Sequence, residues 1–297
     1  MSLDLAKKLI DFSSEVGANS ALLIGGEPTL HNNFFEILNY LKEKNFKTVV
    51  VTNGYKFSDE KFIQKVEDLV DSVGFSIKAA NKEQHKLLTK TDTFEQIKQA
   101  ITNLTKIEKF RAGYSTVISR DTIDNMEEFA EMIAELSPKS WLKFSLCNPS
   151  ISVTDVNKNF TVPHPELVQK VMSKWDKLCE ILDGKVGIEL AMPQCDWPKE
   201  FIDKLKSKNQ VSFGCHLMSR NGLIFDTDAK ILPCNSLTEF PIAEFGKEFS
   251  DKESFEKFWN NDEVKLLYKK FYELPKMECK GCETYSECGG GCPLKHF

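Results

Sequence analysis

Short apolar runs alternate with longer amphipathic segments over residues 1–209, and this alternation restricts the fold more than any other feature. Six of the runs are expected to form buried strands: residues 20–24, 48–51, 73–77, 112–118, 141–146 and 186–190. Strands that alternate with helices in this way indicate βαβ units and a parallel sheet. The sequence therefore predicts an α/β fold, a partial (β/α)6-type TIM-like barrel.

The pattern changes near residue 210, where a second, smaller domain is expected to begin. Two short β runs, residues 221–225 and 230–232, predict a hairpin. Two amphipathic helices are expected after it, over residues 252–259 and 262–272. We therefore expect two domains, the barrel over residues 1–209 and a small α+β module over residues 210–297.

Six cysteines of this module are candidate ligands of a metal or an iron–sulfur cluster. One precedes the hairpin, one follows it, and four lie in the tail at C-x2-C-x5-C-x3-C spacing: Cys215, Cys234, Cys279, Cys282, Cys288 and Cys292. A Cys-x-x-Cys pair brings two thiolates to one site, and a glycine run before the last cysteine lets the backbone fold closely around a bound group. The four tail thiolates could equally hold a single Zn²⁺.

The chain has nine cysteines in all, so three others remain to be placed. Cys147 and Cys179 lie in an expected strand end and an expected helix, and we interpret both as core residues. Cys195 lies in a proline-containing loop, where the sequence favours neither a core nor a ligand role.

The bulk properties exclude several classes of partner. The formal net charge of −5 gives no support for a nucleic-acid partner held through phosphate contacts. No apolar run is long enough to span a membrane, and the N-terminus lacks the apolar segment of a signal peptide. We therefore expect a cytoplasmic protein, in a compartment where cysteines more often bind metals than form disulfides.

The stretch Gly25-Gly26-Glu27-Pro28 follows the first expected strand. Active sites of such folds lie at the carboxyl ends of the strands. Two residues without a Cβ atom let a ligand lie against the backbone, and Glu27 can accept a hydrogen bond from an ammonium group. Spacing alone leaves open a tight strand-to-helix turn with an incidental glutamate.

Together with Val51-Thr52-Asn53-Gly54 and the cysteine-rich tail, this stretch resembles the radical S-adenosylmethionine (SAM) enzymes. The cysteine spacing more narrowly resembles their C-terminal SPASM extension, which carries auxiliary [4Fe–4S] clusters. The resemblance implies an oxidoreductase-type maturase. Such an enzyme modifies a ribosomally made peptide or a protein side chain by hydrogen abstraction with a 5′-deoxyadenosyl radical. The expected partners are that peptide or protein and an electron donor such as ferredoxin or flavodoxin.

The resemblance also assigns residues to cofactors. It implies SAM contacts at Gly25, Gly26, Glu27, Pro28, Asn53 and Ser76. It assigns Cys215, Cys234 and Cys292 to a first auxiliary cluster. It assigns Cys279, Cys282 and Cys288 to a second, which is one ligand short. Asn221 stands where some relatives have a further cysteine.

The family's reductive cluster is held by a C-x3-C-x2-C motif, and no such motif occurs in residues 1–297. The first residues resemble the helix that follows it, so the barrel is expected to lack the family's first strand. Three explanations stay open: a piece of a longer chain, a split gene or misassigned start, or a degenerate relative. The SAM-binding cluster is expected only if that segment is present. The alternative function is a catalytically inactive SAM- or peptide-binding relative with a structural metal site such as zinc.

Overall fold

The computed structural model describes residues 1–275 and 277–296, which group into two compact units. One unit comprises Met1–Ala18, Leu146–Thr161 and Glu189–Phe297, and the other comprises Asn19–Ser145 and Val162–Ile188. We call them the module unit and the sheet unit, and each is described by itself. The expected domain boundary between residues 209 and 210 stays a prediction, since compactness alone does not delimit a functional domain.

A seven-stranded sheet confirms the α/β fold. Its order is β1-β2-β3-β4-β5-β8-β9. The strands are β1 (Ser20–Leu23), β2 (Lys47–Thr52), β3 (Ser72–Ser76), β4 (Arg111–Ile118), β5 (Leu142–Leu146), β8 (Val186–Glu189) and β9 (Val211–Ser212). The pairs β1–β2, β2–β3 and β3–β4 are parallel. All six expected strands are present, whereas β9 was missed because two residues carry no periodic signal.

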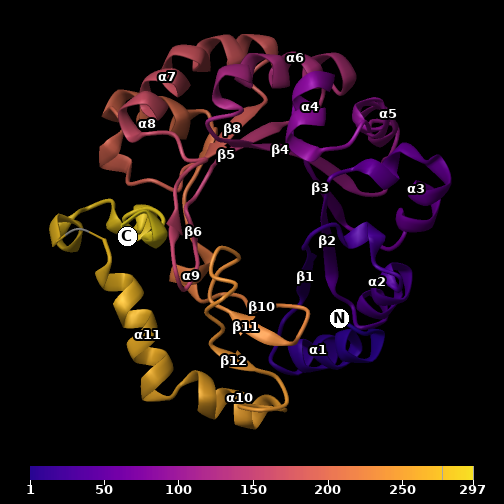
Figure 1. The fold of residues 1–297 in the computed structure, drawn as a ribbon, viewed down its shortest axis with the longest axis vertical. Coiled ribbons are helices and arrows are strands. Elements are labelled where there is room, and N and C mark those ends of the chain that lie inside the picture. The colour runs from indigo at the N-terminus through magenta and orange to yellow at the C-terminus, as the bar shows by residue number, and fades with distance from the viewer. Residues whose placement is uncertain (276, 297) are drawn as a thin grey trace. The chain divides into compact units, whose positions relative to one another are not determined.

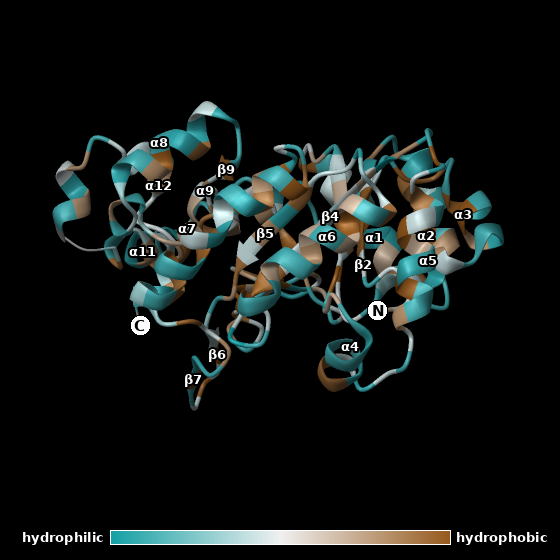
Figure 2. Ribbon diagram, turned by 90° about the horizontal axis from the view of Figure 1, so that it is seen from above, coloured by the Kyte–Doolittle hydropathy of each residue, from teal (hydrophilic) through white to brown (hydrophobic). Residues whose placement is uncertain are grey.

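Helices cover one face of the sheet within the sheet unit (Figure 1). They are α2 (Phe34–Glu43), α3 (Glu60–Val66), α4 (Lys82–Thr89), α5 (Phe94–Leu104), α6 (Met126–Leu136) and α7 (His164–Ile181), with 3-10 turns η1 (Pro28–Leu30), η2 (Tyr55–Ser58) and η3 (Ile123–Asn125). Brown and teal bands alternate along α2, α5 and α6 in Figure 2, as expected of amphipathic helices. Sequence periodicity missed α4 because this helix buries only His85.

The opposite face of the sheet is not filled by a core. The residues that face the helices, including Val50, Phe75, Tyr114 and Phe144, are at most 2% exposed. On the other face, Leu22 pairs in register with Val49, and Val51 pairs with Gly74. Leu22, Ile24 and Val117 are 55%, 48% and 38% exposed.

The module unit contains many short elements. They are α1 (Leu3–Glu15), β6 (Ser150–Ile151), β7 (Val156–Asn157), η4 (Gln194–Asp196), α8 (Lys199–Ser207), α9 (His216–Ser219), β10 (Ile224–Phe225), β11 (Lys230–Leu232), β12 (Ala243–Glu244), α10 (Lys252–Trp259), α11 (Asp262–Glu273), η5 (Met277–Gly281), α12 (Tyr285–Cys288) and η6 (Pro293–His296). The expected hairpin is present as the antiparallel pair β10–β11, and β12 adds a third strand.

Helix α1 packs against the C-terminal residues through one aromatic side chain. The ring of Phe12 lies 5.2 Å from that of Phe249, 5.3 Å from those of Phe245 and Phe255, and 6.2 Å from that of Phe225, centroid to centroid. Such clusters add stability beyond the area that they bury. This contact explains why the first helix belongs to the module unit although the sequence places it beside the first strand.

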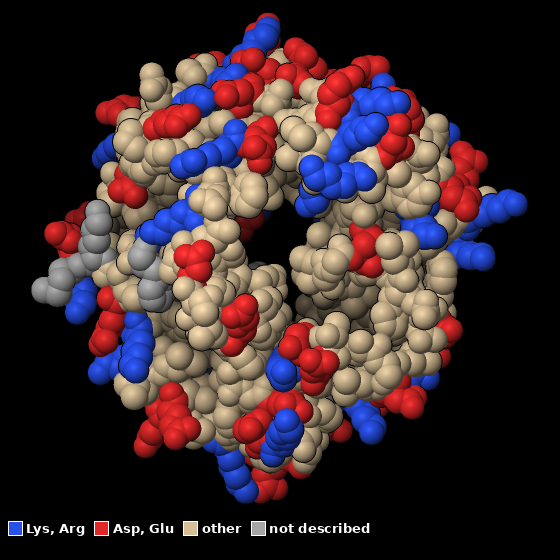
Figure 3. All heavy atoms as spheres, viewed as in Figure 1, with Lys and Arg blue, Asp and Glu red and all other residues tan. Residues whose placement is uncertain are grey.

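Among the described residues, no helix is both long enough and apolar enough to cross a bilayer. Acidic and basic side chains are intermingled on the face shown in Figure 3, so that face carries no broad field of one sign.

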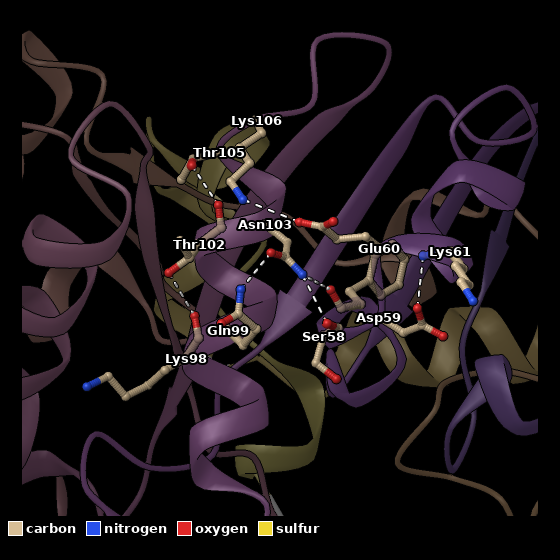
Figure 4. A network of polar contacts seen from close by, with 11 residues as sticks. Ser58, Asp59, Glu60, Lys61, Lys98, Gln99, Thr102, Asn103, Thr105 and Lys106 are labelled. Atoms are coloured by element: carbon tan, nitrogen blue, oxygen red, sulfur yellow. Dashed lines mark hydrogen bonds and ion pairs between the residues drawn. The ribbon is translucent and has the colours of Figure 1, made fainter.

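A buried asparagine fixes the loop that follows β2. Asn103 of α5 is 2% exposed. Its Nδ2 donates to the carbonyl oxygens of Phe57 and Ser58, each at 3.1 Å, and its Oδ1 accepts from Gln99 Nε2 at 2.7 Å (Figure 4). Because η2 begins directly after Gly54, this network sets the position of the Thr-Asn-Gly turn.

Replacing this asparagine with a leucine of similar size should destabilise the sheet unit. Asn103→Leu leaves two carbonyl oxygens without their side-chain donor, so we expect a loss of about 2 kcal/mol in the free energy of unfolding. The matched control is Lys106→Ala, which removes an exposed ion pair to Glu60 at 3.4 Å. It should cost at most about 0.5 kcal/mol. Urea unfolding measures both, and equal losses would contradict the account.

Candidate functional site

The carboxylate of Glu27 joins the carboxyl ends of β1 and β2. Its Oε1 accepts hydrogen bonds from the Thr29 N–H at 3.1 Å, the Thr29 hydroxyl at 2.6 Å and the Thr52 hydroxyl at 2.7 Å. Its Oε2 accepts from the Asn53 N–H at 2.7 Å. The structure thus brings together Glu27 and Asn53, two of the expected SAM contacts. Each carboxylate oxygen has about two lone-pair sites, so Oε2, which accepts the Asn53 N–H, keeps capacity for one more donor.

The residues before Glu27 leave its approach open. A Cβ atom placed on Gly25 or Gly26 would meet no heavy atom within 4 Å. Pro28 occupies the first turn of η1, where a fixed φ and a missing N–H cost nothing. The result is a short stretch of bare backbone beside a carboxylate that its neighbours hold in place.

Ser76, the remaining expected contact, lies at the end of β3 beside a lysine that sequence reasoning missed. The Lys78 ammonium donates to the Ser76 hydroxyl at 2.8 Å. The ammonium reaches solvent, yet the surrounding protein removes part of its hydration and lowers the pKa of Lys78, while the nearby Glu27 carboxylate partly offsets this. The sequence signal that could have indicated Lys78 is its position directly after a buried strand. Glu27, Ser76 and Lys78 therefore share one neighbourhood at the strand ends.

Three of the expected thiol ligands form a first group in the module unit. Burial raises the pKa of the Cys292 thiol to about 11, and the neighbouring thiols of Cys215 and Cys234 raise it further. Burial likewise raises the pKa of Cys215, and the thiol of Cys234 adds to this. Cys234 and Cys292 also pack in one apolar cluster with Leu237. The grouping joins the loop before α9, the end of β11 and the tail.

The other tail thiols form a second group, which includes a cysteine that the sequence left undecided. Burial raises the pKa of the Cys279 thiol, and the thiols of Cys195, Cys288 and Cys282 raise it further. The Cys288 sulfur accepts a hydrogen bond from the Gln194 N–H at 3.3 Å. Cys292, which follows Cys288 in the tail motif, interacts with the first group instead.

The donor set suits iron–sulfur clusters, whose ligands are cysteine thiolates. Among the described residues, no three His, Cys, Asp or Glu side chains converge closely enough to hold one ion. The thiolates of a cluster bind separate irons, so they need not converge to the radius of a single ion. Cys147 and Cys179 are half-buried. Cys147 lies near Lys295, and burial lowers the pKa of that lysine.

The N-terminal part of the chain matches the profile of the Radical SAM superfamily over residues 1–133. The matched part is 133 of the 297 residues. This match covers both the Gly-Gly-Glu-Pro stretch and the Glu27–Asn53 junction. The chain is also similar to the mycofactocin maturase MftC of Mycobacterium tuberculosis, with 25% identity over 306 residues that span the whole of this chain and 72% of that protein.

Other curated relatives are matched over less of their length. Over 139 residues, 44% of this chain is 26% identical to a Methanocaldococcus jannaschii protein described as a putative glycyl-radical enzyme activating enzyme, of which the match covers 51%. Over 121 residues, 40% of this chain is 29% identical to a Saccharolobus islandicus protein described as a probable GTP 3′,8-cyclase, of which the match covers 39%. The chain thus spans about half or less of the length of these relatives.

Two solved structures share the fold. The structure of anSMEcpe with bound AdoMet and a Cp18Cys peptide has a TM-score of 0.69 at 20% identity, with 98% of this chain and 81% of that chain covered. Streptococcus suis SuiB bound to S-adenosylmethionine has a TM-score of 0.56 at 15% identity, with 98% and 66% covered. These likenesses confirm the partial TIM-like fold with a cysteine-rich C-terminal region.

The turn that carries Asn53 should tolerate no side chain at its glycine. Gly54 has φ +85°, and a Cβ atom there would lie 1.9 Å from the ring of Phe75. We expect Gly54→Ala to lower the free energy of unfolding by about 3 kcal/mol, from overpacking and backbone strain together. Gly113→Ala is the control, because a Cβ atom there meets nothing within 4 Å. A Gly54→Ala protein with the thermal stability of Gly113→Ala would contradict this geometry.

Proposed function

We propose that this protein is a radical SAM/SPASM maturase, which modifies a ribosomally made peptide or a protein side chain by hydrogen abstraction. The observation that carries the proposal is the Glu27 junction inside the radical SAM domain, with bare backbone before it. Similarity to a mycofactocin maturase supports a peptide substrate. So does the shared fold with SuiB, which has been solved with its precursor peptide SuiA at a TM-score of 0.58.

In this proposal the strand ends bind the amino-acid part of SAM. The backbone at Gly25 and Gly26 lets the methionyl group lie against it without steric conflict. The Glu27 carboxylate accepts from the ligand's ammonium at Oε2, whose one donor among the described residues is the Asn53 N–H. The Lys78 ammonium, beside Ser76, offers an opposite charge to the ligand's carboxylate. SAM and a reduced [4Fe–4S] cluster, when bound, supply the 5′-deoxyadenosyl radical.

We propose that the C-terminal module, residues 210–297, holds auxiliary [4Fe–4S] clusters rather than zinc. Cys215, Cys234 and Cys292 serve a first cluster, and Cys279, Cys282 and Cys288 serve a second. The division of the tail thiols between two groups supports this, because a zinc site on the four tail cysteines would need Cys292 beside Cys279. A cytoplasmic location and a ferredoxin or flavodoxin donor complete the proposal, since clusters need reducing conditions.

The activity needs three further thiolates in a C-x3-C-x2-C motif, which residues 1–297 do not contain. The test therefore uses the full-length gene product, reconstituted anaerobically with iron and sulfide and reduced in the presence of SAM. We expect 5′-deoxyadenosine to form, as measured by liquid chromatography. A protein that binds SAM but forms no 5′-deoxyadenosine would contradict the enzyme proposal and favour a relative that only binds SAM or peptide.

Removing the charge of Glu27 should weaken SAM binding. Glu27→Gln turns an acceptor into a donor that faces the Asn53 N–H, and it removes the charged partner of the ligand's ammonium. Lost charge-assisted hydrogen bonds of about 1.5–3 kcal/mol correspond to an affinity loss of roughly 10- to 100-fold. Equilibrium dialysis with labelled SAM measures the loss. Glu36→Gln, an exposed glutamate on α2, should bind as the unmodified protein does. Equal affinities in the two variants would contradict the role given to Glu27.

A further inference from the structure

One thiol of the tail accepts a hydrogen bond from a loop that is distant in the sequence. The Gln194 N–H donates to the Cys288 sulfur at 3.3 Å, and the two residues are 94 positions apart. Over residues 1–275 and 277–296, this sulfur is the one acceptor of that N–H, and that N–H is the one donor to this sulfur. The bond therefore depends on tertiary contacts within the module unit and not on the turn that carries Cys288.

A thiol of the first group shows the contrast. The Ser236 N–H donates to the Cys234 sulfur at 3.4 Å. Donor and acceptor are two positions apart, so this bond forms wherever the local turn forms. The bond to Cys288 forms only when the loop after β8 approaches the tail. A substitution in that loop can therefore remove it while the turn around Cys288 stays as it is.

Close backbone contacts dock this loop onto the tail. The Cys292 N–H donates to the Ala191 carbonyl oxygen at 3.1 Å. Gly291 has φ +80°, and a Cβ atom there would lie 2.8 Å from the backbone nitrogen of Pro193. The tail can approach the loop this closely only because position 291 has no side chain. This approach brings the next N–H of the loop, that of Gln194, to the Cys288 sulfur.

Side chains hold the same junction from the other side. The Glu287 carboxylate accepts from Gln194 Nε2 at 3.1 Å and from the Lys206 ammonium at 2.6 Å. That ammonium also donates to Gln194 Oε1 at 3.0 Å and lies 5.3 Å from the centroid of the Phe213 ring. Gln194 is 7% exposed, so its N–H is aimed at the sulfur in a place largely closed to water.

We propose that the Gln194 N–H is a hydrogen-bond donor to the second auxiliary cluster, through the Cys288 sulfur, and that it raises the reduction potential of that cluster. The inference rests on the proposed function, which makes Cys288 a cluster ligand. Hydrogen bonds to the sulfurs are among the factors that set cluster potentials. Reduction adds negative charge to the cluster, and an N–H aimed at a ligand sulfur stabilises that charge. The docked loop thus makes the second cluster easier to reduce.

A proline at position 194 removes this donor with little other change to the backbone. Gln194 is the first residue of η4, and Pro193 before it has φ −55° and ψ 139°. Proline is tolerated in the first turn of a helix, and the residue before a proline favours this extended region. Gln194→Pro lacks both the N–H and the glutamine side chain, whereas Gln194→Ala lacks the side chain alone. The difference between the two variants therefore isolates the N–H.

Potentiometric titration of the anaerobically reconstituted chain, followed by electron paramagnetic resonance, measures the effect. We expect one reduction step to shift to lower potential in Gln194→Pro relative to Gln194→Ala, because the reduced cluster loses its donor. Reduction steps at the same potentials in the two variants overturn the inference and leave the cluster proposal standing. An unmodified chain that takes up zinc and no iron overturns the cluster proposal itself.

A second measurement needs no proline variant and so holds even if Gln194→Pro does not fold. The chain is labelled with glutamine that carries ¹⁵N at its backbone nitrogen, reconstituted and reduced. Electron–nuclear double resonance should then show a ¹⁵N coupling to a reduced cluster. Gln194→Ala, labelled in the same way, carries no label at position 194 and should lack this coupling. A spectrum of the unmodified chain without the coupling, or the same coupling in both proteins, overturns the inference.

Discussion

The strand-end site depends on one constraint: parallel strands place their carboxyl ends, and the loops that follow, at the same edge of a sheet. The loops after β1, β2 and β3 carry Glu27, Asn53 and Lys78. Residues distant in the sequence thus become neighbours without any local signal between them. The helices that cover one face of the sheet help to hold these loops in place, as the hydrogen bonds from Asn103 of α5 to η2 illustrate.

The structure changes the interpretation of Glu27. From the sequence its carboxylate was expected to accept from a ligand's ammonium, and the structure shows that it also accepts four hydrogen bonds from Thr29, Thr52 and Asn53. Its first role is therefore to join two loops, and ligand binding uses what capacity remains at Oε2. A residue that both shapes a site and contacts the ligand is sensitive to small changes, since a neutral glutamine cannot satisfy the same donors.

The sequence predicted most of the fold because most elements are long and periodic. Helix Lys252–Trp259 has the bounds that its apolar spacing indicated, and helix Asp262–Glu273 ends one residue beyond them. The two elements that were missed have physical causes: α4 is polar, and β9 is two residues long. Among site residues, the resemblance indicated Asn53 and Ser76, whereas Lys78 needed the geometry of the strand ends.

The cysteines show the same limit most clearly. Spacing indicated the tail motif, because a Cys-x-x-Cys turn is local. It could not indicate that the loop of residues 193–196 lies beside the tail, because the contact between them joins residues 94 positions apart. The four tail thiols divide between two groups, and this division likewise depends on tertiary contacts that spacing cannot indicate. What appeared to be a single four-ligand motif is divided by the docking of Cys292 onto Ala191.

Anomalous diffraction at the iron absorption edge, from anaerobically grown crystals of the reconstituted protein, tests the account most directly. The account predicts two separate groups of iron peaks in the C-terminal module. One should lie among Cys215, Cys234 and Cys292, and the other among Cys279, Cys282 and Cys288. A single peak bound by Cys279, Cys282, Cys288 and Cys292 would contradict it.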